Sequence, residues 1–349
     1  MSVERKEFGA MPDGKAVYRY ILRNSNENEV HILTLGATLH SFIVDDKNGR
    51  KTDVLLGFDT VEDYLEKSDY QGSTVGPVCN RIGNAAFSID NVEYKLTANE
   101  KDVTCLHSGG EYSFVVWNAM VVDSDTVEFS YTSPDGLNGF PGTINNKVTF
   151  KFTEENKLVI KYSAVSDKDT FINLTNHAYF NLNGFDSGDI LSHSLMIDAD
   201  KVTAVDNMSI PTGENFSVDS TAFDFRQPKL IGKDIEAENE QLGFTGGFDH
   251  NFCINNWDKT LRKCITAEGD ISGLQLNVYT DLPGVQFYAG NFLKGICGKD
   301  GKPMNKRSGF CLETQYYPDS PNKSEFPSCF YKAGEEFSSQ TVYEITFAE

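Results

Sequence analysis

Two residues far apart in the chain have types that suit acid and base catalysis. His177 lies inside residues 173–182, and Glu313 follows the apolar residues 309–312. An imidazole exchanges a proton near neutral pH, and burial raises the pKa of a glutamate toward the range of a general base. Taken alone, a hydrogen-bonded core histidine and a solvated glutamate at a strand end are the more frequent outcomes. The case for chemistry therefore depends on the segments that accompany them.

The residues around His177 are amides and aromatics, a combination that suits sugar binding. Asparagines stand at positions 173, 176 and 181, and aromatic residues at 179 and 180. Amides orient hydroxyl groups or fix a histidine tautomer, and aromatic faces cover the C–H surface of a pyranose ring. Asp249 and Gln286 begin two further segments that combine carboxylate, amide and aromatic side chains. The alternative is an asparagine-rich strand end without a ligand.

Three more residues could hold a polar ligand. Arg81 stands beside Asn80, and its guanidinium offers a fixed fork of donors for vicinal hydroxyls or a carboxylate. His107 is followed by Ser-Gly-Gly, where the glycines allow a sharp turn or the close approach of a ligand. Each signal is weak alone, since Arg81 could equally pair with a surface acid. The prediction of a site depends on the convergence of all these segments.

Strands must bring these residues together, because the dominant period of the sequence is two. Apolar and polar residues alternate at 127–131, 148–152 and 158–162, which predicts an antiparallel meander. The same alternation returns at 274–278 and 343–347.

Helical signals are few. A capping box at 60–63 predicts one short helix, and residues 236–241 suggest another. Without a succession of strands and long helices, a doubly wound α/β sheet is not expected. No linker, low-complexity block or internal repeat divides the chain. We therefore expect an all-β fold, a large antiparallel β-sandwich with a few short helices, as a single domain over residues 1–349.

The charge balance excludes several classes of partner. The chain has 31 Lys+Arg against 51 Asp+Glu and a formal net charge of −20. Binding to nucleic acid or to anionic lipid needs a basic face, so neither is expected. The first nine residues lack the apolar core of a signal peptide, and the most apolar stretch, 112–122, is too short to span a membrane. These features predict a soluble protein.

The cysteines and the missing motifs bear on compartment and cofactors. The seven cysteines are odd in number and include no CxxC pair, which favours buried free thiols and a reducing, cytoplasmic environment. A structural zinc site needs close-set Cys/His pairs that the sequence lacks. Glycine-rich nucleotide-binding loops are absent as well. We expect no metal and no cofactor.

Taken together, these segments resemble the aldose 1-epimerase, or galactose mutarotase, family. The matching segments occur in family order and cover nearly the whole chain: 80–82, 106–110, 139–142, 176–182, 249–252, 286–292 and 313–322. The resemblance implies a β-supersandwich with a sugar-binding cleft and no metal or cofactor. It also implies that Glu313 is the general base and His177 the general acid. The remaining family positions imply substrate contacts at Asn80, Arg81, His107, Asp249 and Gln286.

Three positions depart from the family pattern. Pro77 stands where a second arginine is common, which questions the support of Arg81. Ala178 replaces a common threonine, and Tyr316 a common histidine or asparagine. These two changes bear on the choice of sugar, whereas the predicted acid and base are both present.

The resemblance predicts interconversion of the α and β anomers of a free hexose such as galactose or glucose. A hexose-phosphate 1-epimerase is an alternative that needs more cationic residues. A glycoside hydrolase would use Glu313 and Asp249 as its carboxyl pair. A non-catalytic carbohydrate-binding protein would lack a poised acid and base. The preferred sugar stays open at this point, as does the choice between a monomer and a homodimer.

Overall fold

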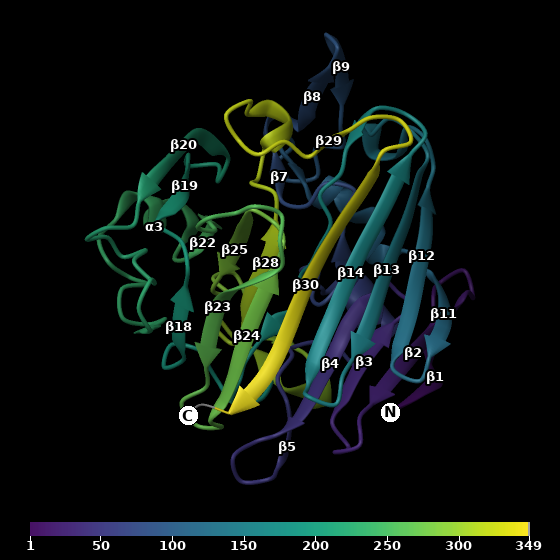
Figure 1. The fold of residues 1–349 in the computed structure, drawn as a ribbon, viewed down its shortest axis with the longest axis vertical. Helices are drawn as coiled ribbons and strands as arrows, with labels where there is room; N and C mark the ends of the chain where they lie inside the picture. The colour runs from purple at the N-terminus through teal and green to yellow at the C-terminus, as the bar shows by residue number, and fades with distance from the viewer. Residues whose placement is uncertain (348–349) are drawn as a thin grey trace.

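The computed structural model describes residues 1–347, and most of them lie in strands. The largest sheet has nine antiparallel strands and forms the front layer in Figure 1. In spatial order its strands are β11 (Asn118–Asp123), β12 (Thr126–Ser133), β13 (Ile144–Phe152), β14 (Lys157–Ser166), β30 (Glu336–Phe347), β24 (Leu274–Thr280), β23 (Arg262–Glu268), β18 (Ser194–Ile197) and β21 (Lys229–Leu230).

This sheet confirms the strands predicted from the period of two. Strands β12, β13 and β14 form the expected meander, in which Phe129 pairs with Val148 and Val148 with Tyr162. Buried and less buried residues alternate along β13. The two later segments are β24 and β30, which pair with each other. The alternating apolar residues thus share the inner face of one sheet.

Two smaller sheets pack on that inner face. One contains β1 (Ser2–Ala10), β2 (Ala16–Arg23), β3 (Glu29–Leu33), β4 (Thr38–Asp45) and β5 (Lys51–Asp53). The other contains β17 (Tyr179–Phe180), β28 (Phe310–Gln315), β25 (Gly284–Tyr288), β22 (Asp249–Cys253), β19 (Lys201–Val205) and β20 (Pro211–Ser217). Phe42 of β4 meets Phe152 edge to face, and Phe180 of β17 meets Tyr343 in the same way. Phe152 and Tyr343 each pair with Leu158, so both small sheets cover one face of the large sheet.

Short paired segments connect these layers. The pairs are β6 (Thr74–Val75) with β16 (Thr175–Asn176), β7 (Arg81–Ile82) with β10 (Cys105–Leu106), β8 (Ala86–Ile89) with β9 (Val92–Lys95), β15 (Thr170–Phe171) with β29 (Phe330–Tyr331), and β26 (Ile296–Cys297) with β27 (Pro303–Met304). The all-β sandwich predicted from the sequence is confirmed, and its strands greatly outnumber its helices (Figure 1).

The helices are short, and one differs from its predicted position. Helix α1 (Val61–Glu66) begins after Thr60, whose side chain accepts a hydrogen bond from Asp63, as the capping box predicts. Helix α3 (Glu240–Thr245) starts later than the predicted segment 236–241. The cause is Asn239, whose side chain accepts from two backbone N–H groups of the first turn. Helix α2 (Glu111–Phe114) was not predicted.

Two further findings concern the cysteines and the membrane. All seven cysteines are free, and all except Cys297 are buried, which agrees with the predicted free thiols except at that exposed position. Within residues 1–347, every helix falls short of the length and apolarity needed to cross a membrane.

Candidate active site

The six-stranded sheet turns a polar face away from the nine-stranded sheet. Glu313 of β28 pairs with Gln286 of β25, and Gln286 pairs with Asn251 of β22. Because side chains alternate along a strand, Asp249 lies on the same face as Asn251. The opposite face carries Leu312, whose carbonyl accepts a hydrogen bond from a tyrosine of β30. One sheet therefore holds three predicted site residues on one face and contributes to the core with the other.

The other four predicted site residues come from connecting segments. Asn80 and Arg81 lie at β7, His107 opens the 3-10 helix η2 (His107–Gly110), and His177 lies between β16 and β17. The N–H of His107 donates to the carbonyl of Asn80, which joins the first two segments beside the β7–β10 pair. His107 has φ +50°, so the chain turns sharply into the glycine pair that follows.

These segments enclose a pocket of about 200 Å³. Six of the seven predicted site residues line it: Asn80, Arg81, His107, His177, Asp249 and Glu313. Gln286 does not line it. Its amide nitrogen donates to Asp249 Oδ1 at 2.7 Å, so it contacts the carboxylate and lies outside the wall of the pocket.

His177 and Glu313 face each other across this pocket. Their Nε2 and Oε1 atoms are 3.7 Å apart, and both side chains are almost fully buried. Burial lowers the pKa of His177 to about 4. Burial raises the pKa of Glu313 well above its ordinary value, with Asp249 adding to the rise and Arg81 opposing it. Glu313 Oε2 has no hydrogen-bond partner among the described residues, so it remains free to accept a proton from a ligand.

The other ring nitrogen of His177, Nδ1, contacts a cysteine thiol. Cys311 Sγ lies 3.5 Å from His177 Nδ1. Burial raises the pKa of this thiol well above its usual range, so the thiol keeps its hydrogen and can donate it to Nδ1. Tyr179 stacks on the His177 ring with centroids 5.1 Å apart. These contacts direct Nε2 toward Glu313.

His107, His177 and Glu313 are also close enough to be considered as metal ligands. One donor atom of each lies within 4.8 Å of the others. The backbone N–H of Asn80, however, donates to His107 Nδ1 at 3.1 Å. A neutral ring that accepts at Nδ1 carries its hydrogen on Nε2, so Nε2 has no lone pair for a metal. The donor set therefore fits a hydrogen-bonded polar ligand better than a metal ion.

Arg81 is held by carboxylates on two sides. Its guanidinium donates two hydrogen bonds of 2.9 Å to Glu100, one to each oxygen. A third nitrogen lies 3.9 Å from Asp249. Glu100 lines the pocket but was not predicted as a site residue, because it lies in a polar run, 99–102, that resembles an exposed loop. Because Pro77 stands where a second arginine is common, the support of Arg81 was in doubt. Glu100 holds the Arg81 guanidinium instead.

Aromatic side chains complete the wall. Tyr70 meets the edge of His107 with ring centroids 4.5 Å apart, and Tyr288 stacks near Phe292. All three aromatic residues line the pocket. Tyr288 and Phe292 lie in the segment 286–292 singled out in the sequence, whereas no sequence signal pointed to Tyr70.

The departures from the family pattern lie outside the pocket wall. Tyr316 exchanges two hydrogen bonds with Asn173, and the carbonyl of Pro77 accepts from the Asn173 N–H. Ala178 is buried in the core. All three are absent from the pocket lining, so their effect on the choice of sugar would have to be indirect.

A β-sandwich whose polar pocket pairs an imidazole with a carboxyl has the arrangement of an acid/base enzyme for a small hydroxylated molecule. The family model described as aldose 1-epimerase matches residues 18–344. The chain belongs to the aldose 1-epimerase family, whose members are isomerases, and the resemblance seen in the sequence is confirmed.

Individual relatives agree with this assignment. The chain is 43% identical to a galactose mutarotase of Bos taurus over the whole of both chains. It is 35% identical to an aldose 1-epimerase of Escherichia coli K12 over 96% of each chain. Among solved structures, a galactose 1-epimerase from Lactobacillus acidophilus is similar with a TM-score of 0.88 and 25% identity, and the match covers all of both chains.

Proposed function

We propose that this protein interconverts the α and β anomers of free hexoses such as galactose and glucose, with Glu313 and His177 transferring the protons. Two observations support the proposal. Relatives named galactose mutarotase and aldose 1-epimerase match the chain over nearly its full length. The observation that carries the chemistry is the 3.7 Å approach of His177 Nε2 to Glu313 Oε1 in a pocket of about 200 Å³.

The reaction needs one base and one acid on neighbouring oxygens of the same ring. Glu313 removes the proton of the anomeric hydroxyl while His177 protonates the ring oxygen, and the ring C–O bond breaks to give the open aldehyde. Rotation about C1–C2 presents the other carbonyl face. The reverse proton transfers then close the ring as the other anomer. General acid and base groups each contribute about 10² to 10⁴-fold.

The charge state of the pair sets the pH dependence. The reaction needs one titratable proton on the pair, either on Glu313 or on His177, because these two forms interconvert by proton transfer. Below about pH 4 His177 gains a second proton, and no base remains. At high pH Glu313 loses its proton, and no acid remains. We expect kcat/KM to follow a bell whose upper limb lies above the ordinary pKa of a glutamate.

The remaining polar groups hold the sugar hydroxyls. His107 offers an Nε2 hydrogen, Arg81 offers guanidinium donors, and Asp249 accepts. Gln286 acts through Asp249, whose carboxylate it holds at 2.7 Å. Such orientation of the ring supports catalysis by keeping the reacting oxygens near the acid and base.

The charges of the pocket disfavour a phosphorylated sugar. Arg81 is its one cationic side chain, and its donors already face Glu100 and Asp249. Four carboxyl groups line the same pocket: Asp69, Glu100, Asp249 and Glu313. A phosphate dianion would meet net negative charge, whereas a neutral hexose meets alternating donors and acceptors. We further propose that residues 1–349 form one domain and that the protein works in the cytoplasm.

The direct test is anomer exchange of freshly dissolved α-D-galactose, followed by polarimetry. We expect the purified protein to shorten the approach to equilibrium in proportion to its concentration. Glucose 6-phosphate serves as the contrasting substrate and should react far more slowly. A galactose rate equal to the spontaneous rate would exclude the epimerase function.

A further inference from the structure

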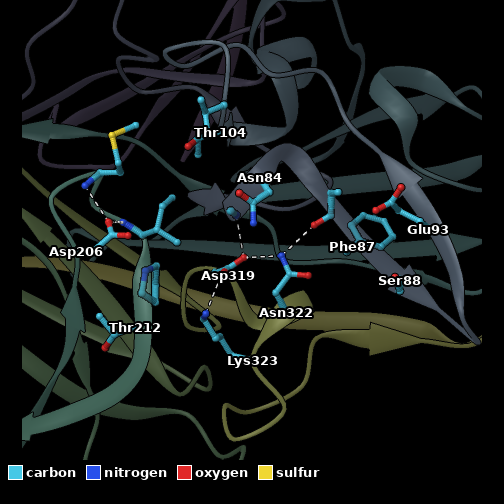
Figure 2. A pocket seen from close by; sticks show the side chains of 16 residues that line it. Asn84, Phe87, Ser88, Glu93, Thr104, Asp206, Thr212, Asp319, Asn322 and Lys323 are labelled. Carbon is cyan, nitrogen blue, oxygen red and sulfur yellow. Dashed lines mark hydrogen bonds and ion pairs between the residues drawn. The ribbon is translucent and has the colours of Figure 1, made fainter.

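Two groups of residues outside the pocket support its walls in different ways. Figure 2 shows the first group, in a neighbouring hollow of about 590 Å³. There Asp319 Oδ1 accepts from the Gly83 N–H at 2.9 Å and from Asn322 at 2.8 Å. The N–H of Asp319 donates to the carbonyl of Arg81 at 2.9 Å. These bonds hold the backbone of residues 81–83, whereas the second group acts on side chains.

The second group is a chain of hydrogen bonds behind Asp249. Cys79 Sγ lies 3.4 Å from Gln315 Oε1, and Gln315 Nε2 lies 3.5 Å from Gln286 Oε1. Gln286 Nε2 then donates to Asp249 Oδ1 at 2.7 Å. Cys79 and Gln315 are fully buried, and Gln286 nearly so. Of these four residues, Asp249 is the one that lines the pocket, so the chain reaches the pocket through this carboxylate.

Three neighbouring strands place the amides of this chain on one face of their sheet. Strands β28, β25 and β22 lie side by side (Figure 1). Gln315 of β28 pairs with Gly284 of β25, and Gln286 lies two residues further along β25, opposite Glu313. Residues two apart point to the same side of a strand, so both amides share the face of Glu313. A Cβ at Gly284 would lie 2.4 Å from Asn251 Oδ1, so the glycine leaves room for the amides to meet.

The thiol of Cys79 determines one end of the Gln315 amide. The nitrogen of an amide donates and its oxygen accepts, so turning the group over exchanges donor and acceptor. Burial raises the pKa of the Cys79 thiol well above its usual range, so the thiol keeps its hydrogen. The thiol therefore donates to Gln315 Oε1, and Gln315 Nε2 points the other way.

Asn251 fixes the same orientation from the other end. Asn251 Nδ2 donates to Thr203 Oγ1 at 2.9 Å, and the Thr203 hydroxyl donates to Asn215 at 3.0 Å. The Asn251 oxygen consequently faces Gln315 Nε2, which lies 3.4 Å away. A reversed Gln315 would place its own oxygen against this acceptor. Two separate contacts thus hold the Gln315 amide in one orientation.

The orientation of Gln315 decides which end of Gln286 faces Asp249. Gln315 Nε2 donates to the Gln286 oxygen, so the Gln286 nitrogen is the end that donates to Asp249 Oδ1. A reversed Gln286 would set an oxygen against the carboxylate, with no hydrogen between two acceptors. Hydrogen bonds to an ionised carboxylate are stronger than those between neutral groups, so this contact holds the carboxylate firmly.

We propose that Gln315 is a positioning residue, which keeps the Gln286 nitrogen toward Asp249 and so prepares this carboxylate to accept a hydroxyl of the sugar. The inference rests on the proposed function and extends it to a buried residue outside the pocket wall. Gln315 takes no part in the proton transfers. Its effect therefore falls on KM rather than on kcat.

The test separates orientation from packing. Gln315→Glu keeps the shape of the side chain but replaces the donor nitrogen by an oxygen, which attracts the Gln286 nitrogen away from Asp249. Gln315→Met removes the polar contacts and supplies no such oxygen. Each change is also made together with Gln286→Met. Thr314→Val, a buried change of similar shape on the opposite face of β28, is the matched control. Anomer exchange of galactose gives kcat and KM, and thermal melting checks folding.

We expect Gln315→Glu to raise KM about tenfold or more and Gln315→Met about threefold to tenfold, with kcat within about twofold, as for the loss of one hydrogen bond. Combined with Gln286→Met, neither change should raise KM further, because no amide is left to orient. Thr314→Val should keep both constants. Either Gln315 variant, with and without Gln286→Met, suffices if the other does not fold.

Three results would overturn the positioning role while leaving the epimerase function intact. They are an unchanged KM, a larger effect of Gln315→Met than of Gln315→Glu, and a rise in KM that persists in the Gln286→Met background. The second result would indicate packing, and the third would show that Gln315 acts by another route. A wild-type protein that leaves galactose at its spontaneous rate would instead overturn the proposed function.

Discussion

Two histidine–carboxyl pairs in this molecule have the same separation and different surroundings. His177 and Glu313 are 3.7 Å apart, and so are His193 and Asp270. Both histidines are buried, and burial lowers the pKa of each to about 4. Neither the distance nor the state of the imidazole distinguishes the two pairs.

The carboxyl groups distinguish them. The Glu313 side chain is 3% exposed and faces a pocket, whereas that of Asp270 is 40% exposed and meets solvent. His193 Nε2 accepts the N–H of Leu182 at 3.0 Å, which engages that nitrogen in structure. Burial raises the pKa of the Glu313 carboxyl well above its ordinary value, and this carboxyl faces a pocket that a ligand can enter. The environment of the carboxyl, more than that of the histidine, therefore distinguishes the pair that we propose to be reactive.

Neutralising each carboxyl in turn should separate the two pairs most strongly. We expect Glu313→Gln to lower kcat about 10³ to 10⁴-fold, because the amide cannot take the anomeric proton. Asp270→Asn should leave kcat unchanged. Polarimetry with α-D-galactose measures both. A large loss in Asp270→Asn, or full activity in Glu313→Gln, would show that the two pairs have been assigned the wrong way round.

The next largest effect concerns the two imidazoles. We expect His177→Gln to lower kcat about 10² to 10³-fold, since an amide cannot protonate the ring oxygen. His193→Gln keeps an acceptor for the Leu182 N–H and should retain kcat while it alters stability. Initial rates on galactose, paired with thermal melting, separate the two outcomes. If His193→Gln stays folded and yet loses activity, the pair of His193 and Asp270 takes part in catalysis.

Much of this fold was accessible from alternation along the strands. In β13 the buried residues fall on every second position, so the sequence alone predicts which face meets the core. Helix α1 was predicted from one threonine, because capping is a local interaction. Helix α3 was placed too early because Asn239 was not recognised as its N-cap, although this side chain accepts from two backbone N–H groups of the first turn.

The site was predicted less evenly. The segments around His177 and Glu313 carried a recognisable pattern, and six predicted residues do line the pocket. Glu100 and Tyr70 were missed because they reach the pocket from loops whose paths depend on the whole fold. Gln286 is not among the residues that line the pocket, and its amide nitrogen donates to Asp249, so its contact with the sugar stays a prediction. Such contacts depend on how strands that are distant in the sequence pair, and the composition of a segment does not predict that pairing.

The buried imidazole of His193 should make the stability of the protein depend on pH. The pKa of His193 is about 4 in the folded protein and near 6.5 when unfolded, so the unfolded chain binds more protons between these values. Stability is therefore complete above about pH 6.5 and falls as the pH drops toward 4. This residue contributes roughly 3 kcal/mol to that loss. Urea unfolding at pH 7 and pH 5 should show a smaller difference for His193→Gln than for wild type, and an equal difference would contradict the assigned pKa.

The smallest expected effect concerns two arginines, Arg81 and Arg226, that pair with carboxylates in different surroundings. Arg81 is 13% exposed and grips Glu100 with two hydrogen bonds, whereas Arg226 lies at the surface among Asp200, Asp219 and Asp224. A lysine keeps the charge but lacks the planar fork, so Arg81→Lys should raise KM for galactose about tenfold with little change in kcat. Arg226→Lys should leave both constants unchanged, because exposed ion pairs contribute little. A fall in kcat with constant KM for Arg81→Lys would instead place the guanidinium in the proton transfers, since an orienting group acts on the bound sugar before the ring opens.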